Sequence, residues 1–241
     1  MSMAAEATKK RKAGENVASS SSKAKWPLIK PKKNLQISLL KHSDLFIVPD
    51  FFTSAESKSF IKAAESIGFE HQGSLGPSKG EAYRDNDRIA VDDPVLANTV
   101  WQSGLNRLFS DIKIRGKAAV GLNSNIRFYR YKVGQHFGPH IDESVNIGDG
   151  KRTHYTLLIY LSGHSKPKTK TDQNSLAGGE TVFYGLRNSI VAELRVWLYF
   201  TFMETSACCM KPGTLPKASN MCSAQMSFLL DNYPNISKFY H

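Results

Sequence analysis

The stretch from Asn125 to Glu143 constrains the fold more than any other part of the chain. It reads NIRFYRYKVGQHFGPHIDE. Aromatic and apolar residues alternate with polar ones from Arg127 to Val133 and again from Gln135 to Asp142, a period of two that is typical of strands. Gly134 separates the two runs and permits a chain reversal. We therefore expect two neighbouring strands here.

Two potential metal ligands lie close together in the second of these runs. His140 and Asp142 are two residues apart, so in a strand both side chains would project from the same face. One divalent ion would then be able to bind an imidazole and a carboxylate at once. Tyr131 precedes His140 by nine residues and would share the pocket across the sheet. A lone His-x-Asp is common by chance, so the pair needs support from other motifs.

The first half of the chain has a helical period instead. Thr53 and Glu56 form a capping-box pattern that predicts a helix from Ser54 to Ile67. Pro94 marks the start of a second amphipathic helix that we expect to reach Ile112. The polar, glycine-containing segment from Gly73 to Asp93 between them is predicted to be a loop.

Short strand-like runs fill the second half of the chain and are separated by turn-rich segments. They cover residues 125–133, 135–142, 153–162, 178–184 and 188–193. Several short strands behind two helices favour an α+β fold built on a double-stranded β-helix, or jelly-roll, with two supporting N-terminal helices. A chain of 241 residues is long enough for one such domain with a sizeable core.

The net charge of +11 is concentrated near the start of the sequence. Met1 to Lys33 holds nine basic and two acidic residues, which accounts for +7. We expect residues 1–38 to be a disordered basic tail. Its run from Lys9 to Lys12 is either a nuclear localisation signal or a solvated charge cluster. Nucleic-acid binding beyond weak tail contacts is not expected, because no aromatic residues interleave with these charges.

The cysteines and the hydropathy pattern bear on the compartment. All three cysteines, Cys208, Cys209 and Cys222, lie in the last 34 residues, so the predicted domain has no disulfide. This favours a reducing compartment, the nucleus or the cytoplasm. We expect no secretory signal and no membrane span, because no apolar run approaches the necessary length.

Four motifs occur in an order that resembles a known enzyme family. The region from Leu45 to Glu193 resembles the iron(II)/2-oxoglutarate dioxygenases of the plant prolyl 4-hydroxylase type. The matching segments are Tyr131-x-x-Gly134, His140-x-Asp142, Arg152 to Ser162, and Gly178-Gly179-Glu180-Thr181. Separated motifs in the same order carry more weight than any one of them alone.

The resemblance implies a metal site and a co-substrate site. His140 and Asp142 would be two of the three ligands that hold Fe(II) on one face. Tyr131 and Tyr160 match positions that hydrogen-bond the distal carboxylate of 2-oxoglutarate, although Tyr160 is equally well explained as a core aromatic on a buried strand. Ascorbate would be required as a reductant.

The resemblance also implies a protein or peptide substrate. Arg84 and Arg88 would border the mouth of the active site and touch that substrate; alternatively they belong to a solvated surface loop with internal ion pairs. Three other histidines, His136, His154 and His164, lack a partner at strand spacing, so we interpret them as surface or core residues.

The family pattern stops after Glu193. The family requires a second histidine ligand on a late strand and then a Lys or Arg that anchors 2-oxoglutarate, yet the only histidine after Glu180 is His241. We interpret residues 39–193 as an incomplete dioxygenase domain and residues 194–241 as an atypical tail that replaces the final strands and leaves a sheet edge open.

The genetic code suggests an origin for this tail. One nucleotide earlier, the codons of Met203-Glu204 and Met210-Lys211 must encode Gly and Glu, those of Trp197-Leu198 encode Ala or Val, and the remaining codons permit the missing end of the domain. We hypothesise a frame-shifted product, which sequencing of the transcript across the codon for Glu193 would test. The sequence thus predicts a dioxygenase that hydroxylates a protein and has reduced or no activity in this form; the alternative is a catalytically silent binding isoform of the same fold.

Overall fold

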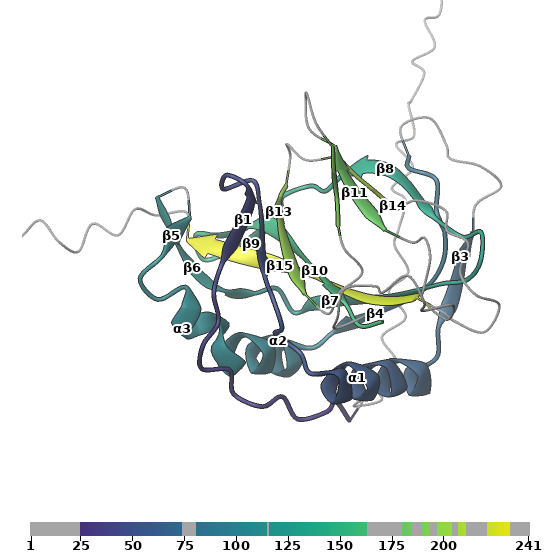
Figure 1. Ribbon diagram of the computed structural model, residues 1–241, viewed down its shortest axis with the longest axis horizontal. Coiled ribbons are helices and arrows are strands. Elements are labelled where there is room, and N and C mark those ends of the chain that lie inside the picture. Colours follow the sequence, from purple (N-terminus) through teal and green to yellow (C-terminus); the bar gives the residue numbers. More distant parts are fainter. Residues whose placement is uncertain are drawn as a thin grey trace, which may run out of the picture.

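The larger of two antiparallel sheets organises the fold, and helices cover one of its faces (Figure 1). The structure is a computed structural model that describes residues 25–73, 81–114, 116–162, 180–184, 189–192, 197–203, 207–210 and 221–231. The smaller sheet packs against the other face of the larger one. None of the helices within these ranges has the length and apolar character that a membrane crossing requires.

The larger sheet contains strands from both ends of the described chain. Its order is β1 (Ser38–Lys41), β2 (Leu45–Val48), β13 (Leu198–Phe202), β10 (Lys151–Tyr160), β15 (Met221–Asp231), β7 (Asn125–Tyr131), β4 (Asp85–Asp92) and β3 (Glu70–Gly73). Three short strands pair beside this path: β5 (Lys113–Ile114), β6 (Lys117–Leu122) and β9 (Asn146–Gly148). The smaller sheet has the order β12 (Ser189–Val191), β11 (Thr181–Tyr184), β14 (Ala207–Met210) and β8 (Phe137–Ile141).

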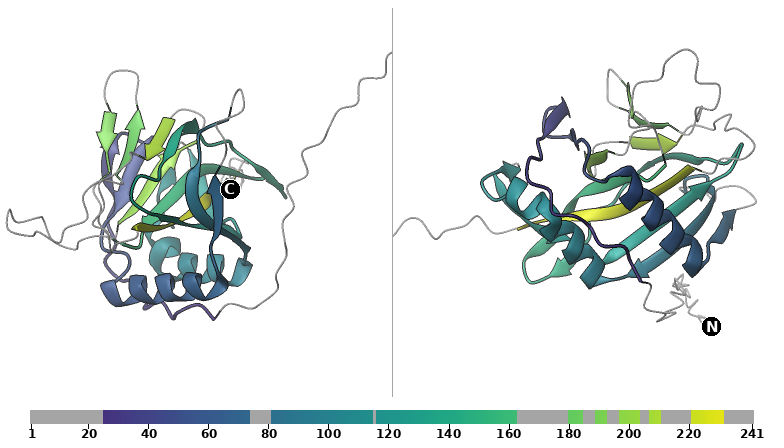
Figure 2. Two further views of the ribbon diagram at one scale, coloured as in Figure 1. Left: turned by 90° about the vertical axis from the view of Figure 1, so that its right-hand side faces the viewer. Right: turned by 60° about the horizontal axis from the view of Figure 1, so that its bottom comes forward.

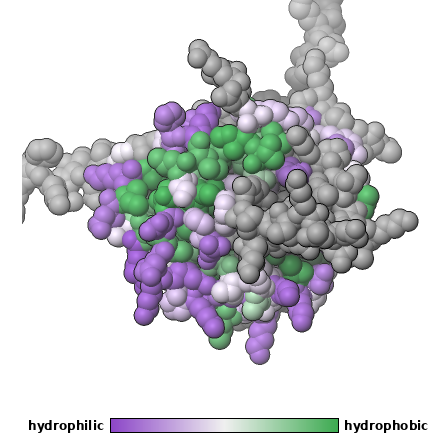
Figure 3. Space-filling view, viewed as in Figure 1, coloured by the Kyte–Doolittle hydropathy of each residue, from purple (hydrophilic) through white to green (hydrophobic). Residues whose placement is uncertain are grey.

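Both helices predicted from the sequence are present. The first, α1 (Ser54–Ile67), has the predicted bounds and the Thr53 capping box. The second begins as predicted with α2 (Pro94–Val100), continues through a π-helical turn (Trp101–Leu105) and ends with α3 (Asn106–Leu108), four residues earlier than expected. Both lie beneath the larger sheet in Figure 1 and in the left view of Figure 2, and the lower part of the molecule is largely hydrophilic in Figure 3.

Strand alternation gives the larger sheet two different faces, as β10 shows. Tyr155, Leu157 and Ile159 belong to the core that α1 and α2 cover. Leu158 and Tyr160 belong to a second core, shared with the smaller sheet. Each core excludes water from one face, so both sheets and the helices are held by apolar burial.

The last part of the segment predicted to be a loop between the two helices forms strand β4, and residues 74–80 of that segment lie outside the described ranges. Its polar residues hid the strand period, because a buried carboxylate is not expected in a strand. Asp87 is only 4% exposed and accepts hydrogen bonds from Arg130 at 2.8 Å and Lys132 at 3.1 Å. Burial would raise the pKa of Asp87, but hydrogen bonds from Arg130, Lys132 and His71 hold it below its ordinary value. The ion pairs therefore make a polar strand stable here.

The prediction of a disordered tail up to residue 38 is wrong for residues 25–38. Trp26 stacks on Phe128 with ring centroids 5.0 Å apart and donates a hydrogen bond from its indole nitrogen to Asp93. The chain then crosses the second helix, where Lys32 donates its backbone N–H to Ser103. Gly104, with φ of 152°, permits this crossing, because a Cβ there would lie 2.9 Å from the Lys32 carbonyl oxygen. Residues 1–24 lie outside the described ranges.

The prediction that the tail leaves a sheet edge open is also wrong for the strands that the structure describes. Residues 198–202, which are rich in aromatics, form β13, and β14 and β15 were not expected. β15 lies between β10 and β7 in the larger sheet, and β14 pairs with β8 in the smaller one. The atypical tail thus completes both sheets.

Glu56 ties the N-terminal segment to α1. Its carboxylate is 2.7 Å from the Lys32 ammonium and accepts backbone hydrogen bonds from Lys30 and Thr53, both at 2.8 Å. Burial would raise the pKa of Glu56, but these bonds hold it below its ordinary value. A lowered folded-state pKa means that the carboxylate stabilises the fold above its unfolded pKa and that this contribution is lost as pH falls through the folded-state pKa.

We expect Glu56→Gln to lower the free energy of unfolding at neutral pH by about 2 kcal/mol, because charge-assisted hydrogen bonds are lost. The variant should lose less stability than the native chain between about pH 6 and pH 3, which denaturant titrations at each pH would measure. Glu65→Gln on the exposed side of α1 is the control. Parallel loss of stability in E56Q and the native chain would contradict this assignment.

Candidate functional site

Backbone pairing with the segment before β4 positions β8 at the mouth of the site. Gly138 donates its N–H to the Tyr83 carbonyl at 2.8 Å, and Asp85 donates to the His136 carbonyl at 3.0 Å. Gly138 permits this close approach, because a Cβ there would lie 3.3 Å from the Tyr83 backbone nitrogen. The pairing fixes the backbone that carries the two potential metal ligands.

The structure brings His140 and Asp142 together on one side of β8. The Nε2 atom of His140 is 3.6 Å from Oδ1 of Asp142, and both side chains are mostly buried. The Nδ1 atom of His140 lies 2.9 Å from the Gly138 carbonyl oxygen, so it carries the proton and donates to that oxygen. When the ring is neutral, Nε2 is then the nitrogen free to bind a metal ion, and Asp142 lies beside it.

Two further residues hold the Asp142 carboxylate in place. Thr156 on β10 donates its hydroxyl to Oδ2 at 2.5 Å, and Gln225 on β15 donates its amide to the same oxygen at 3.3 Å. Oδ1 accepts neither bond and faces His140. This is how supporting hydrogen bonds orient a metal-binding carboxylate.

A cavity of about 40 Å³ extends from His140 and Asp142 into the space between the sheets. Its lining comprises Tyr129, Tyr131, Phe137, His140, Asp142, Thr156, Leu158, Thr181, Phe183, Thr201, Ser223 and Gln225. The hydroxyls of Thr201 and Ser223 are buried and make no hydrogen bond within the described part of the chain. Two such hydroxyls are available to a polar ligand.

The tyrosines suggested by the resemblance occupy different positions. Tyr131 lines the cavity and stacks on Tyr129. Tyr160 is fully buried, and its hydroxyl donates to the Thr181 hydroxyl at 2.5 Å and accepts from the Thr181 backbone at 3.1 Å. Tyr160 does not line the cavity, so its hydroxyl supports the wall through Thr181.

His140 and Asp142 are two potential ligands for a divalent metal ion, and the described residues do not supply a third. Among the described residues, no group of three His, Cys, Asp or Glu side chains is arranged to hold a metal. His136 stacks on Tyr83 and His154 lies 3.3 Å from the Lys117 ammonium, so neither joins the pair. His164 lies outside the described ranges, as do Gly178 and Gly179.

The cavity also differs from a site built for a dicarboxylate. None of its described lining residues is a lysine or an arginine, so hydroxyls are the donors available there. Thr201, Ser223 and Gln225 were not predicted from the sequence. They belong to β13 and β15, strands whose pairing partners lie far away in the chain. The aromatic residues of β13 are typical of a strand and were a signal for the position of Thr201.

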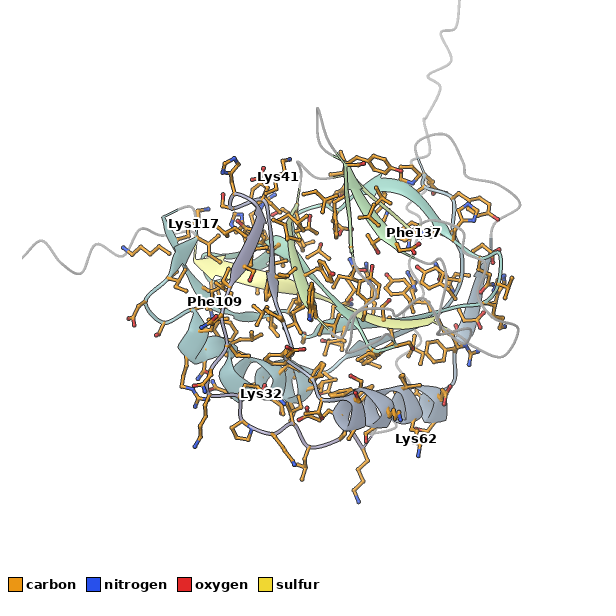
Figure 4. The ribbon with its side chains drawn as sticks, viewed as in Figure 1. Lys32, Lys41, Lys62, Phe109, Lys117 and Phe137 are labelled. Carbon is orange, nitrogen blue, oxygen red and sulfur yellow. The ribbon has the colours of Figure 1, made fainter. Side chains whose placement is uncertain are left out.

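A larger groove of about 880 Å³ lies outside the cavity and shares His140 and Asp142 with it. Arg84 and Arg88, the residues that we expected to contact substrate, both line this groove. Arg84 lies over the Phe137 ring, which Figure 4 labels in the region between the two sheets.

The comparisons with known proteins find this fold among solved structures. No family model and no curated protein matches the sequence. A viral collagen prolyl hydroxylase from Paramecium bursaria Chlorella virus-1, solved with 2OG, aligns with a TM-score of 0.51 and 18% identity, over 78% of this chain and 96% of that one. A prolyl hydroxylase from Trichoplax adhaerens, in complex with a hypoxia inducible factor peptide, aligns with a TM-score of 0.56 and 13% identity, over 83% of this chain and 89% of that one. The chain therefore has the fold of the prolyl hydroxylases.

We expect Thr156→Val to weaken binding of a divalent metal such as Mn²⁺ about tenfold, because Asp142 loses the hydroxyl that orients it. Isothermal titration calorimetry of the full chain would measure this affinity. Thr99→Val is the matched control, since Thr99 donates its hydroxyl to Val95 on α2, away from the site. Equal affinities in T156V and T99V would contradict the role of Thr156.

Proposed function

We propose that the protein is an Fe(II)- and 2-oxoglutarate-dependent dioxygenase that hydroxylates a protein substrate on a double-stranded β-helix. The observation that carries the proposal is the His140–Asp142 pair, held 3.6 Å apart at the opening of a cavity between two sheets. The fold supports it, because the Trichoplax enzyme with the same fold was solved with a peptide.

The residues present fit part of the iron site. His140 Nε2 and Asp142 Oδ1 would hold the ion, which when bound supplies the oxygen-activating chemistry of such enzymes. Thr156 and Gln225 would keep the carboxylate oriented while the ion is bound. An imidazole and a carboxylate from one strand suit Fe(II), and the incomplete ligand set predicts weak binding.

The residues also fit part of the co-substrate. Thr201 and Ser223 would donate their unpaired hydroxyls to a carboxylate in the cavity, and Tyr131 lines the same space. Neutral donors make weaker hydrogen bonds to a carboxylate than a guanidinium or ammonium does. We therefore propose that 2-oxoglutarate binds weakly and that turnover is slow. Tyr160 would not contact 2-oxoglutarate; its hydroxyl would only hold Thr181 in the cavity wall.

A catalytically silent binding isoform is the second candidate. The specific observation in its favour is that no cationic side chain lines the described cavity. A frame-shifted tail would explain this, since Thr201, Ser223 and Gln225, which β13 and β15 contribute to the cavity, are uncharged where the family pattern requires a charged anchor. In either case the protein would act in the nucleus or the cytoplasm, and ascorbate would support turnover of the active form.

Conversion of labelled 2-oxoglutarate to labelled succinate tests the proposal directly. We expect slow Fe(II)- and ascorbate-dependent turnover by the full chain, and Asp142→Ala should reduce it at least about 100-fold by removing a metal ligand. Asp111→Ala, at an exposed position three residues after α3, is the control and should retain turnover. A folded, soluble chain that produces no succinate would reject the enzyme and support the silent isoform.

A further inference from the structure

Three arginines in the outer groove lack acidic partners. Arg84, Arg88 and Arg127 all line the groove of about 880 Å³, and each is partly buried. Within the described ranges none of them forms an ion pair. By contrast, two other basic side chains, of Arg130 and Lys132, share the Asp87 carboxylate. We propose that the groove binds a polypeptide segment with acidic residues on both sides of the residue that reaches His140.

Strand register places two of these arginines beside the cavity. Arg88 is the cross-strand partner of Tyr129, which lines the cavity. Arg127 is the partner of Gln225, whose amide holds the Asp142 carboxylate. Directly paired residues share a face of a sheet. The two guanidinium groups therefore flank the path from the groove to the metal ligands.

Arg84 is held at a defined position by ring stacking. Its guanidinium carbon lies 4.4 Å from the centroid of Phe137, and the Phe137 ring stacks on the His140 ring at 3.8 Å. The backbone is fixed as well, because Arg84 and Phe137 form an isolated β-bridge. A guanidinium prearranged in this way loses little freedom when it binds a carboxylate.

The acidic residues of the groove do not neutralise these arginines. Glu81 and Glu143 are exposed at its rim, where solvent screens their charge. The Asp142 carboxylate lies beside His140 and accepts hydrogen bonds from Thr156 and Gln225. A partly buried guanidinium without a partner favours a carboxylate from outside the chain.

The lining favours a polypeptide over a single-stranded nucleic acid. No Phe, Tyr or Trp is among the described residues of the groove, so it offers no stacking platform for bases. The groove does reach β3, the last strand of the larger sheet, through His71, Gln72 and Gly73. An edge strand offers backbone N–H and C=O groups to an extended peptide.

This inference rests on the proposed function for its substrate class, but its test needs no turnover. Short fluorescent peptides with one central proline and flanking Glu, Gln or Lys would be titrated with the metal-free full chain, and fluorescence anisotropy would report binding. We expect the Glu peptide to bind at least about tenfold more tightly than the Gln peptide at low salt, and this preference to shrink as salt rises.

The matched variants are R84Q/R88Q/R127Q and K58Q/K62Q/K113Q, each with three positive charges removed. Lys58 and Lys62 lie on the exposed side of α1, on the far side of the larger sheet from the groove, as Figure 4 shows for Lys62. The arginine variant should lose the preference for the Glu peptide, and the lysine variant should keep it. A second variant, R88E/R127E, should prefer the Lys peptide, which loss of folding cannot mimic.

Three results would overturn the inference: equal binding of the Glu and Gln peptides, equal effects of the arginine and lysine variants, or tighter binding of an oligonucleotide of the same charge. Turnover of 2-oxoglutarate together with equal binding of the Glu and Gln peptides would contradict only the inference of an acidic substrate. Binding of the Glu peptide through these arginines without turnover of 2-oxoglutarate would contradict only the proposed dioxygenase activity.

Discussion

The separation of the two faces of the larger sheet is the constraint on which the site depends. Successive residues of β10 alternate between the helix-covered core and the space between the sheets, so Tyr155 and Leu157 anchor the strand while Thr156 reaches Asp142. A shift of one residue in register would exchange these faces. The apolar contacts with α1 and α2 therefore determine which hydroxyls and amides can reach His140 and Asp142.

The described strands of the C-terminal segment complete this architecture and contribute only uncharged side chains to the cavity. β15 occupies the centre of the larger sheet and places Ser223 and Gln225 on the cavity side, while β13 places Thr201 there. Burial of two hydroxyls without partners is unfavourable unless a ligand or water binds them. The cavity thus retains polar donors, and the strongest positive charges near it lie outside, in the groove.

The sequence predicted the parts of the fold and of the site that depend on local patterns. A period of two and a spacing of two residues were enough to place His140 and Asp142 side by side, and the capping box located α1 correctly. Features that depend on distant contacts were missed. β4 looked like a loop because the partners that make Asp87 stable in a strand, Arg130 and Lys132, are some forty residues away along the chain.

The central claim is that His140 and Asp142 bind one divalent ion. A crystal structure of the full chain soaked with Mn²⁺ tests this claim most directly. Anomalous scattering should reveal one ion about 2.2 Å from both His140 Nε2 and an oxygen of Asp142, a distance that metal–ligand bonds require. An ion bound elsewhere, or density that shows the two side chains turned away from each other, would contradict the claim.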